Sequence, residues 1–341
     1  QVDLFVGNGG TSYAAEDIFY RGTADATFEA VGDALTAPPS QPTNGLVACD
    51  FDDDGDLDVF ASHYAVSVNN GHDALWENDG GDFKNVAEET GFAALITGNY
   101  YLHMLEWIDE EEPGATAATA IGGNGFGIDC ADVNGDGKLD IFQTNISHAD
   151  LDYSRQWSDP SQLLINTGDG FQNEWRERNL PFNEGDIDGA FVDFDNDGRL
   201  DLSISREDKY EDRYPDQEQH GWFGLMHQGE DGQFTSLSLS SGINDTTGED
   251  TWKRMKRAQN HAWADIDHDG DLDLLVGGRD QGGGRPNFLF RNDLGHQNRW
   301  VAFDVVGDGE AVHRDAFGTR ITFDWGETKQ VREKKSARGT Y

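Results

Sequence analysis

Four nine-residue segments of the chain space their side-chain oxygens in a way that suits a hard cation. Each reads Asp, any residue, Asp or Asn, any residue, Asp, Gly, any residue, Leu, Asp; they are residues 50–58, 132–140, 193–201 and 265–273. Oxygens at the first, third, fifth and ninth positions, with a backbone carbonyl at the seventh, form the kind of cage that Ca²⁺ prefers. Glycine at the sixth position permits the tight turn.

The pattern therefore predicts four calcium-binding loops, in which the seventh residue contributes only its backbone carbonyl. The predicted ligand residues are, in chain order, Asp50, Asp52, Asp54, Asp56 and Asp58; Asp132, Asn134, Asp136, Lys138 and Asp140; Asp193, Asp195, Asp197, Arg199 and Asp201; and Asp265, Asp267, Asp269, Asp271 and Asp273.

Two other interpretations of these segments are possible. An EF-hand loop needs Glu at its twelfth position, but the four twelfth positions hold Ala61, Gln143, Ile204 and Val276. Asp and Gly also mark ordinary polar turns. Four copies with the same Leu-Asp ending favour cation loops, because the ionised carboxylates would otherwise repel one another.

The elements around the loops indicate short strands. Each loop runs into an apolar segment (VFAS, IFQT, LSIS or LLVG), and the chain has 42 Gly and 20 Phe among 341 residues. A second signature, an apolar pair followed by turn residues and an aromatic residue, predicts β-hairpins. Its copies are residues 17–28, 74–83, 163–171, 224–234 and 288–300.

Together these signatures predict a four-strand unit of strand A, cation loop, strand B, connection, strand C, tight turn and strand D. In the second unit the strands are expected at 45–49, 57–62, 74–77 and 83–86. Alternating strands put the cation loop and the C–D turn at one face, and the long insertions at the other. Since loops on a rigid scaffold usually carry binding sites, the insertion face is the predicted functional face.

Residues 1–10 match the end of such a unit. Asp3 would be a ninth-position residue, which predicts a fifth cation site completed by residues before Gln1. Ninth positions then fall 55–82 residues apart, as expected for propeller blades with variable insertions.

Composition limits the possible partners. The net charge of −40 comes from 65 acidic and 25 basic residues, which disfavours nucleic acid and anionic membranes and favours cations or basic partners. Adaptation to a salty environment explains the surplus acid equally well.

No apolar run approaches the length of a membrane span, and no signal peptide is visible. Cys49 and Cys130 precede cation loops at different offsets, which favours two buried thiols over a disulfide.

The loops with their trailing strands resemble the FG-GAP/VCBS repeats of integrin α-like β-propellers. Residues 298–323 resemble the start of an ASPIC/UnbV segment, since Arg314, Asp315, Ala316, Gly318 and Arg320 fit its pattern, while His313, Phe317 and Thr319 depart from it. The resemblance to the cartilage acidic protein family implies a propeller over 1–306, with seven blades when intact, and the start of an ASPIC/UnbV-like segment over 307–341. It also implies a secreted or cell-surface calcium-binding protein that acts in adhesion.

Other polar groups have less specific signals. His63 and His148 follow strand B in neighbouring units and could hold a second metal at the insertion face. His103, His220, His227 or His261 could join them, but surface histidines are the simpler explanation.

A basic cluster (Lys253, Arg254, Lys256, Arg257) suits an acidic glycan or a solvated loop. Glu184, Asp186 and Asp188 could serve glycoside chemistry, but an exposed acidic connector is favoured.

Two functions follow from these features. The first is an extracellular or periplasmic calcium-stabilised propeller that binds a protein or glycan, including a basic one, without catalysis. The second is a secreted enzyme, either a polysaccharide lyase or hydrolase or a metal-dependent oxidase, with its site at the propeller mouth. Three or more His or carboxylate side chains that converge at the insertion face would favour the enzyme.

Overall fold

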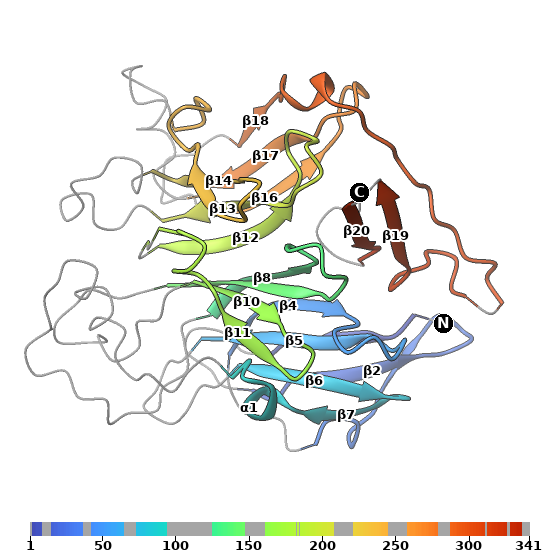
Figure 1. Ribbon diagram of the computed structural model, residues 1–341. Helices are drawn as coiled ribbons and strands as arrows, with labels where there is room; N and C mark the ends of the chain where they lie inside the picture. The colour runs from blue at the N-terminus through green and yellow to red at the C-terminus, as the bar shows by residue number, and fades with distance from the viewer. Residues whose placement is uncertain are drawn as a thin grey trace, which may run out of the picture.

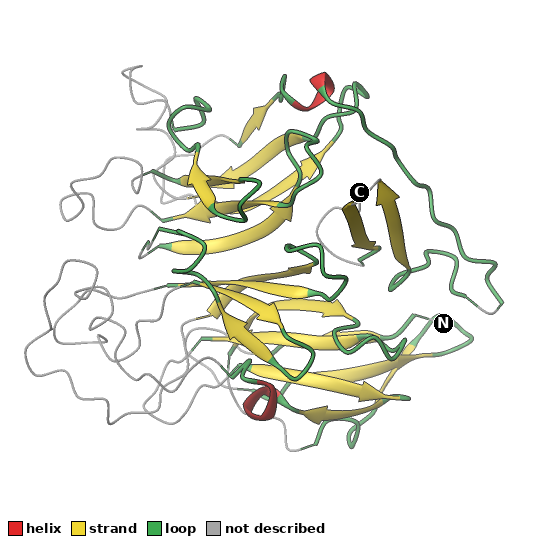
Figure 2. Cartoon of the chain, in the orientation of Figure 1, coloured by secondary structure: helices red, strands yellow, loops and turns green. Residues whose placement is uncertain are grey.

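The computed structural model describes residues 2–8, 15–36, 42–64, 73–93, 125–146, 161–181, 183, 185–207, 221–244, 258–278, 287–310, 312–325 and 328–335. These residues form six antiparallel sheets, with a short helix α1 (Ala87–Thr90) and a 3-10 helix η4 (Gly295–Gln297). The all-β prediction is confirmed. In Figures 1 and 2 the first and second sheets overlap at the bottom, and the third, fourth and fifth sheets follow above them up to the orange strands at the top.

Three consecutive sheets have four strands in the up-and-down order that the sequence predicted. The second sheet holds β4 (Thr43–Cys49), β5 (Asp58–His63), β6 (Ala74–Asp79) and β7 (Asp82–Asn85). The third holds β8 (Gly125–Ala131), β9 (Asp140–Asn145), β10 (Gln162–Asn166) and β11 (Phe171–Asn173). The fourth holds β12 (Asp186–Val192), β13 (Asp201–Arg206), β14 (Phe223–Gln228) and β15 (Phe234–Ser236).

The remaining sheets are smaller. The first holds β1 (Leu4–Val6), β2 (Ile18–Gly22) and β3 (Phe28–Ala30); the fifth holds β16 (Ala258–Ala264), β17 (Asp273–Gly278) and β18 (Phe288–Phe290); the sixth is a hairpin of β19 (Arg320–Trp325) and β20 (Thr328–Glu333). The hairpin prediction is confirmed for its first four copies but is wrong for 288–300. There β18 pairs only with β17, and the chain continues into η4.

The first five sheets pack face to face, which explains why their middle strands are apolar on both sides. In β5, Phe60 faces the third sheet, whereas its neighbours Val59 and Ala61 face the first. In β9, Ile141 faces the second sheet and Phe142 the fourth. A strand with a sheet on each face has no solvent side, so its sequence loses the alternation of polar and apolar residues.

The two cysteines join neighbouring sheets. Cys49 of β4 and Cys130 of β8 form a disulfide, and both are fully buried. The expectation of two thiols is wrong, because it took side chains on opposite strand faces to be too far apart. Opposite faces of equivalent strands are the surfaces that meet when two sheets stack. Cys49 pairs with Asp58, but Cys130 lies one residue before the partner of Asp140.

Strand direction places the cation loops and the C–D turns at one end of the sheets, which we call the loop end; the opposite end is the far end. Gly80 of the β6–β7 turn donates its N–H to Asp56 of the first loop at 2.9 Å. The predicted shared face is therefore confirmed. The insertions themselves lie mostly outside the described residues, as do His103, His148, His220, Glu184 and the basic cluster at 253–257.

The hairpin β19–β20 lies against the loop end, at the right in Figure 1. Arg320 contacts Asp53 at 2.6 Å and the backbone carbonyl of Asp50 at 2.7 Å. Just after β20, Lys335 reaches the buried Asp129 of β8 at 2.5 Å. The basic residues of this segment thus face the first cation loop and a buried aspartate of the third sheet.

Candidate cation sites

The first aspartate of each loop is held by the glycine of its sixth position. The N–H groups of Gly55, Gly137, Gly198 and Gly270 donate to Asp50, Asp132, Asp193 and Asp265 at 3.0–3.2 Å. All four glycines have φ between 93° and 97°, so the turn predicted at the sixth position is confirmed. The fourth residue is also left-handed in every loop; Asp53, Gly135, Asn196 and His268 occupy it, all types that tolerate this conformation.

The ninth aspartate of each loop accepts two backbone N–H groups. In the first loop, Asp58 accepts from Phe51 at 3.1 Å and from Asn78 of β6 at 2.9 Å. The same pair of bonds is found at Asp140, Asp201 and Asp273. Asp3 likewise accepts from Gly22 of β2 at 2.9 Å, which confirms its place as a ninth-position residue.

Sequence reasoning missed a second use of the strand-C residue. The side-chain amides of Asn166, Gln228 and Asn292 each donate to the eighth-position carbonyl of their own loop and to the second-position carbonyl of the preceding loop. Asn78 makes the first of these bonds, to the carbonyl of Leu57 at 3.0 Å. The signal was present in the sequence, because in the last four of the five copies an Asn or Gln stands one residue beyond the apolar pair.

The carboxylates of the loops are strongly perturbed. Burial, with a smaller contribution from neighbouring aspartates, raises the pKa of Asp58 to about 8, of Asp140 to about 7 and of Asp201 to about 9. Burial also raises the pKa of Asp193 to about 6. These groups resist ionisation because negative charges are crowded where water is excluded, and a cation at the same place would relieve that cost.

The side chains converge as a cation site requires in three of the four loops. Ligand atoms lie within 4.8 Å of one another in the groups Asp50–Asp52–Asp58, Asp193–Asp195–Asp201 and Asp265–Asp267–Asp269. One buried oxygen each of Asp193 and Asp265 has no hydrogen-bond partner. The second loop has Asn134 at its third position, so it offers fewer carboxylates. Hard oxygen donors and unpartnered carboxylate oxygens fit a divalent ion such as Ca²⁺, which would neutralise the loop.

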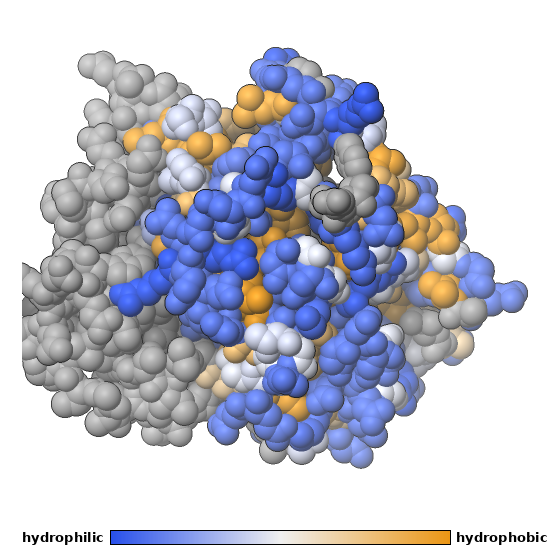
Figure 3. All heavy atoms as spheres, in the orientation of Figure 1, coloured by the Kyte–Doolittle hydropathy of each residue, from blue (hydrophilic) through white to orange (hydrophobic). Residues whose placement is uncertain are grey.

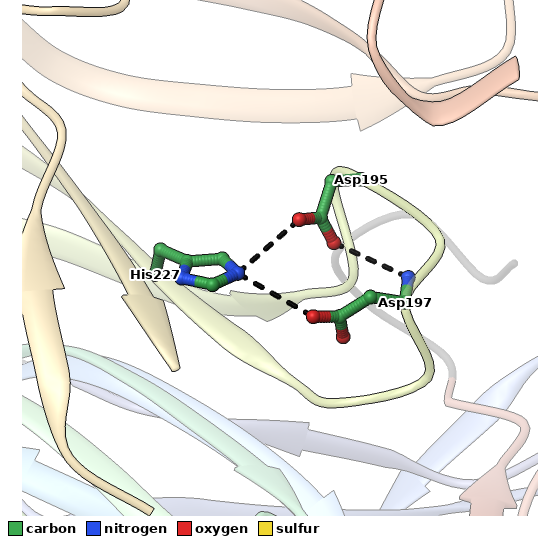
Figure 4. Close-up of side chains that lie close together, drawn as sticks. All are labelled: Asp195, Asp197 and His227. Atoms are coloured by element: carbon green, nitrogen blue, oxygen red, sulfur yellow. Dashed lines mark hydrogen bonds and ion pairs between the residues drawn. The ribbon is translucent and has the colours of Figure 1, made fainter. Parts of the chain in front are cut away.

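The third loop is contacted by His227, whose position differs from the one that we expected from the sequence. His227 was expected near the insertion face, but it lies on β14 at the loop end, with Nε2 3.2 Å from Asp195 and 3.4 Å from Asp197 (Figure 4). Its ring makes an edge contact with Phe194. Asp195, Asp197 and His227 form a fourth converging group.

At the far end, the predicted metal ligand His63 is fully buried at the end of β5. Its Nε2 lies 3.7 Å from a carboxylate oxygen of Asp17, and its backbone N–H donates to Asp73 at 2.7 Å. All four converging groups found among the described residues include aspartates of the cation loops, and His63 belongs to none of them. His148, its expected partner, lies outside the described residues.

Asp186 and Asp188 were expected in an exposed acidic connector, and this prediction is wrong. Both lie in β12 and are buried. Asp186 accepts from Arg206 at 2.8 Å and from Ser161 at 2.7 Å, all three side chains being buried. An ion pair between the adjacent strands β12 and β13 accounts for the buried Asp186.

His261 lies between the fourth and fifth sheets rather than at the far-end surface. It hydrogen-bonds Ser203 at 2.8 Å and Ser205 at 2.9 Å, and Asp188 is 3.5 Å away. Burial lowers the pKa of His261 to about 3, so the ring is neutral. The set looks like a Ser–His–Asp constellation, but the side chain of His261 is fully buried and so are both serines. It holds the two sheets together.

Comparisons with known proteins identify neither a family nor a close relative. No family model matches the chain, and no curated protein matches it. One similar solved structure is a lectin of Agrocybe aegerita that recognises non-reducing terminal N-acetylglucosamine; it is 16% identical, with a TM-score of 0.40, over 82% of this chain and 62% of the lectin. Another is the V. cholerae biofilm matrix protein Bap1, 12% identical, with a TM-score of 0.32, over 80% of this chain and 34% of Bap1.

The chain thus spans less than two thirds of either structure's length, and both likenesses are too distant to bear on its function. The FG-GAP/VCBS and ASPIC/UnbV resemblances stay predictions. Among the described residues, no helix has the length and apolar character needed to span a membrane.

Proposed function

We propose that the chain is a secreted calcium-binding β-propeller that acts as an adhesion or recognition module through its far end. The observation that carries this proposal is the repetition of one cation-loop geometry. Each loop has the same glycine turn, the same doubly bonded ninth aspartate and the same amide from strand C. Calcium ions at these loops would pin strand A to strand B in each blade.

Exposed apolar residues support the propeller. Leu4 in β1 points away from the second sheet and is 42% exposed; on the fifth sheet, Leu275 and its cross-strand partner Leu289 are 45% and 59% exposed. The equivalent faces of the middle sheets are buried against a neighbour. Further blades against the first and fifth sheets would cover these residues and lead toward the seven-bladed ring that the resemblance implies.

The use of the far end for recognition is supported by what covers the loop end. The cation loops and the β19–β20 hairpin take up the loop end, whereas the long connections leave from the far end. The Cys49–Cys130 disulfide supports secretion, because such bonds persist in oxidising compartments.

A groove offers a described surface for a partner. It has a volume of about 610 Å³ and runs between α1 and the strands β10 and β11. Glu88, Gln162, Asp169 and Asn173 line it together with Phe171, whose ring packs on the core rings of Phe60 and Phe92. Carboxylates and amides suit the hydroxyls of a glycan, or a basic peptide.

The calcium proposal is tested by calcium titration calorimetry with metal analysis of the purified protein. We expect several bound calcium ions per chain and, in the triple variant Asp50→Asn, Asp193→Asn, Asp265→Asn, loss of binding at every loop except the second. A protein that binds no calcium would overturn it.

The recognition proposal is tested separately, on a glycan array and against extracellular matrix proteins, with Asp169→Ala and Gln172→Ala as groove variants. Calcium-dependent binding that the groove variants weaken would support recognition through this groove. Binding that survives in both variants would move recognition to the insertions.

A further inference from the structure

The strand-C residue beside each cation loop differs in chemistry from loop to loop. It is the residue before the Asn or Gln whose N–H bonds the ninth aspartate. In the first four-stranded sheet this residue is Glu77, in the next Ile165, then His227, and in the fifth sheet Arg291. One structural position thus presents an acid, an apolar group, an imidazole and a guanidinium to otherwise similar loops.

The two charged cases act on their loops through charge alone. Glu77 is close enough to Asp52 to raise the pKa of that carboxyl, although burial and Asp54 contribute more. Arg291 is exposed and pairs with Asp293 at 2.8 Å, within reach of the charges of Asp267 and Asp269. Ile165 is buried and brings no ligand atom. These three loops therefore offer oxygen donors only.

The third loop is different because His227 aims a nitrogen at the cage. Its Nε2 faces carboxylate oxygens of both Asp195 and Asp197, at 3.2 and 3.4 Å (Figure 4). A charge-assisted N–H···O⁻ bond is usually about 2.7–2.9 Å long, so neither contact is a good ion-pair hydrogen bond. Two ligands bound to one ion at about 2.1 Å are roughly 3.0 Å apart at a right angle and roughly 3.4 Å apart at the tetrahedral angle, which matches both distances.

We propose that the third loop is a mixed nitrogen–oxygen site for a first-row transition metal ion, with His227, Asp195 and Asp197 as its ligands. This inference rests on the proposed function, since it takes the loop to be a cation site, and it changes which ion that site selects. Calcium binds oxygen donors, whereas imidazole favours ions such as Zn²⁺. Asp193 converges with Asp195 and Asp201, and one of its buried oxygens has no hydrogen-bond partner among the described residues.

Arg199 is the one described basic side chain, besides the histidine itself, that contacts these ligands. It pairs with Asp197 through Nη2 and donates from Nε to the carbonyl of Gln228 at 2.9 Å. The oxygen of Asp197 that faces His227 is the one that Arg199 binds. The guanidinium therefore competes with a bound metal, and its removal should tighten binding.

The test is a Zn²⁺ titration of the intact chain in saturating Ca²⁺, followed by calorimetry and by the ring-nitrogen signals of ¹⁵N-labelled histidines. We expect Zn²⁺ to shift one histidine ring, and that signal to be missing in His227→Gln. His227→Gln should weaken Zn²⁺ binding at least about ten-fold, the scale on which even outer-shell partners alter metal affinity. Arg199→Gln should strengthen it.

Glu77→His is the matched control, because it places an imidazole at the same position beside the first loop, whose third and fifth positions also hold aspartates, Asp52 and Asp54. It should add a second Zn²⁺ site. Equal Zn²⁺ affinity in the original chain and His227→Gln, with both folded by circular dichroism, would overturn the inference and leave His227 as an ion-pair partner only. Zn²⁺ binding lost in His227→Gln, in a chain that takes no calcium, would instead overturn the calcium proposal and keep the third site.

Discussion

The two ends of the sheets treat buried acid in opposite ways. At the loop end, Asp58 and Asp201 receive backbone N–H groups and lie among other carboxylates. At the far end, each buried acid has a side chain of this protein against it. Asp186 has Arg206, and Asp73 accepts from Gln143 at 2.7 Å.

The difference teaches that the stack is completed from outside at one end only. Backbone N–H groups position a carboxylate but bring no full positive charge, so in the proposed function bound cations supply that charge at the loop end. At the far end, the guanidinium of Arg206 supplies a positive charge from within the chain. Sensitivity to chelators and to pH should therefore be concentrated in the loops. Four measurements test this contrast between the two ends.

Removal of divalent ions should have the largest effect. A site filled at a hundred times its dissociation constant stabilises the fold by about 2.7 kcal/mol, so four sites would contribute about 11 kcal/mol. We expect a chelator to lower the melting temperature steeply in scanning calorimetry, and calcium to restore it. Identical melting curves with and without chelator would remove the contrast between the two ends.

Arg206→Met should come next. It leaves the Asp186 carboxylate buried without its countercharge, and breaking a buried pair from one side costs about 3–5 kcal/mol. Urea unfolding should show this loss equally in calcium and in chelator, since the far end does not depend on cations. Arg206→Met with Asp186→Asn should recover much of it. A loss that appears only in chelator would contradict this division.

The pH dependence of the metal-free protein should be a smaller effect. The raised pKa values of Asp140 and Asp201, about 7 and about 9, mean that the folded state holds protons more tightly than the unfolded chain. This stability is complete below about pH 4, the usual range of an aspartate, and is lost as the pH rises through 7 to 9. Melting temperatures in chelator should fall over that range.

Asp201→Asn is the matched variant for this dependence. In chelator, it should reduce the fall of the melting temperature at alkaline pH. In calcium, it should lower stability, because the carboxylate is then needed to bind the ion. A melting temperature that rises with pH in chelator would show that these acids are compensated from within the chain.

Arg320→Gln should have the smallest effect. Its partner Asp53 is largely exposed, and exposed ion pairs contribute about 1 kcal/mol or less. Hydrogen exchange should nevertheless speed up in β19 and β20, because Arg320 also holds the carbonyl of Asp50. Unchanged exchange would mean that other contacts hold the hairpin on the loops.

The repeated parts of the fold could be predicted from the sequence, because each is specified locally. The Asp and Gly spacing specified the turn at Gly55 and its counterparts, and the apolar pairs specified strands B and C. Asp3 could be recognised as a ninth-position residue for the same reason.

What could not be predicted depends on contacts between sheets. The Cys49–Cys130 disulfide, the burial of His261 and the Arg206–Asp186 pair all require knowing which strand faces meet. His227 was placed at the wrong end because its position was counted from the insertions rather than from Gln228, its neighbour on strand C. The docking of β19–β20 on the loops has no local signal apart from its basic residues.

The segment between the fifth sheet and the hairpin exposes Trp300, Val301 and Phe303, and Figure 3 shows apolar atoms at that side of a largely hydrophilic face. The joints between successive sheets, in contrast, include polar contacts. There an amide from Asn166, Gln228 or Asn292 reaches a backbone carbonyl of the sheet before it.

Because the acceptor is a main-chain atom, the residue that carries it is free to vary, and it is Phe51, Val133 and Phe194 in turn. A duplicated sheet would thus carry both the amide donor for the sheet before it and the carbonyl acceptor for the sheet after it. Adding or removing whole four-strand units keeps this contact between neighbouring sheets. The number of units can therefore change in evolution without new contacts between them.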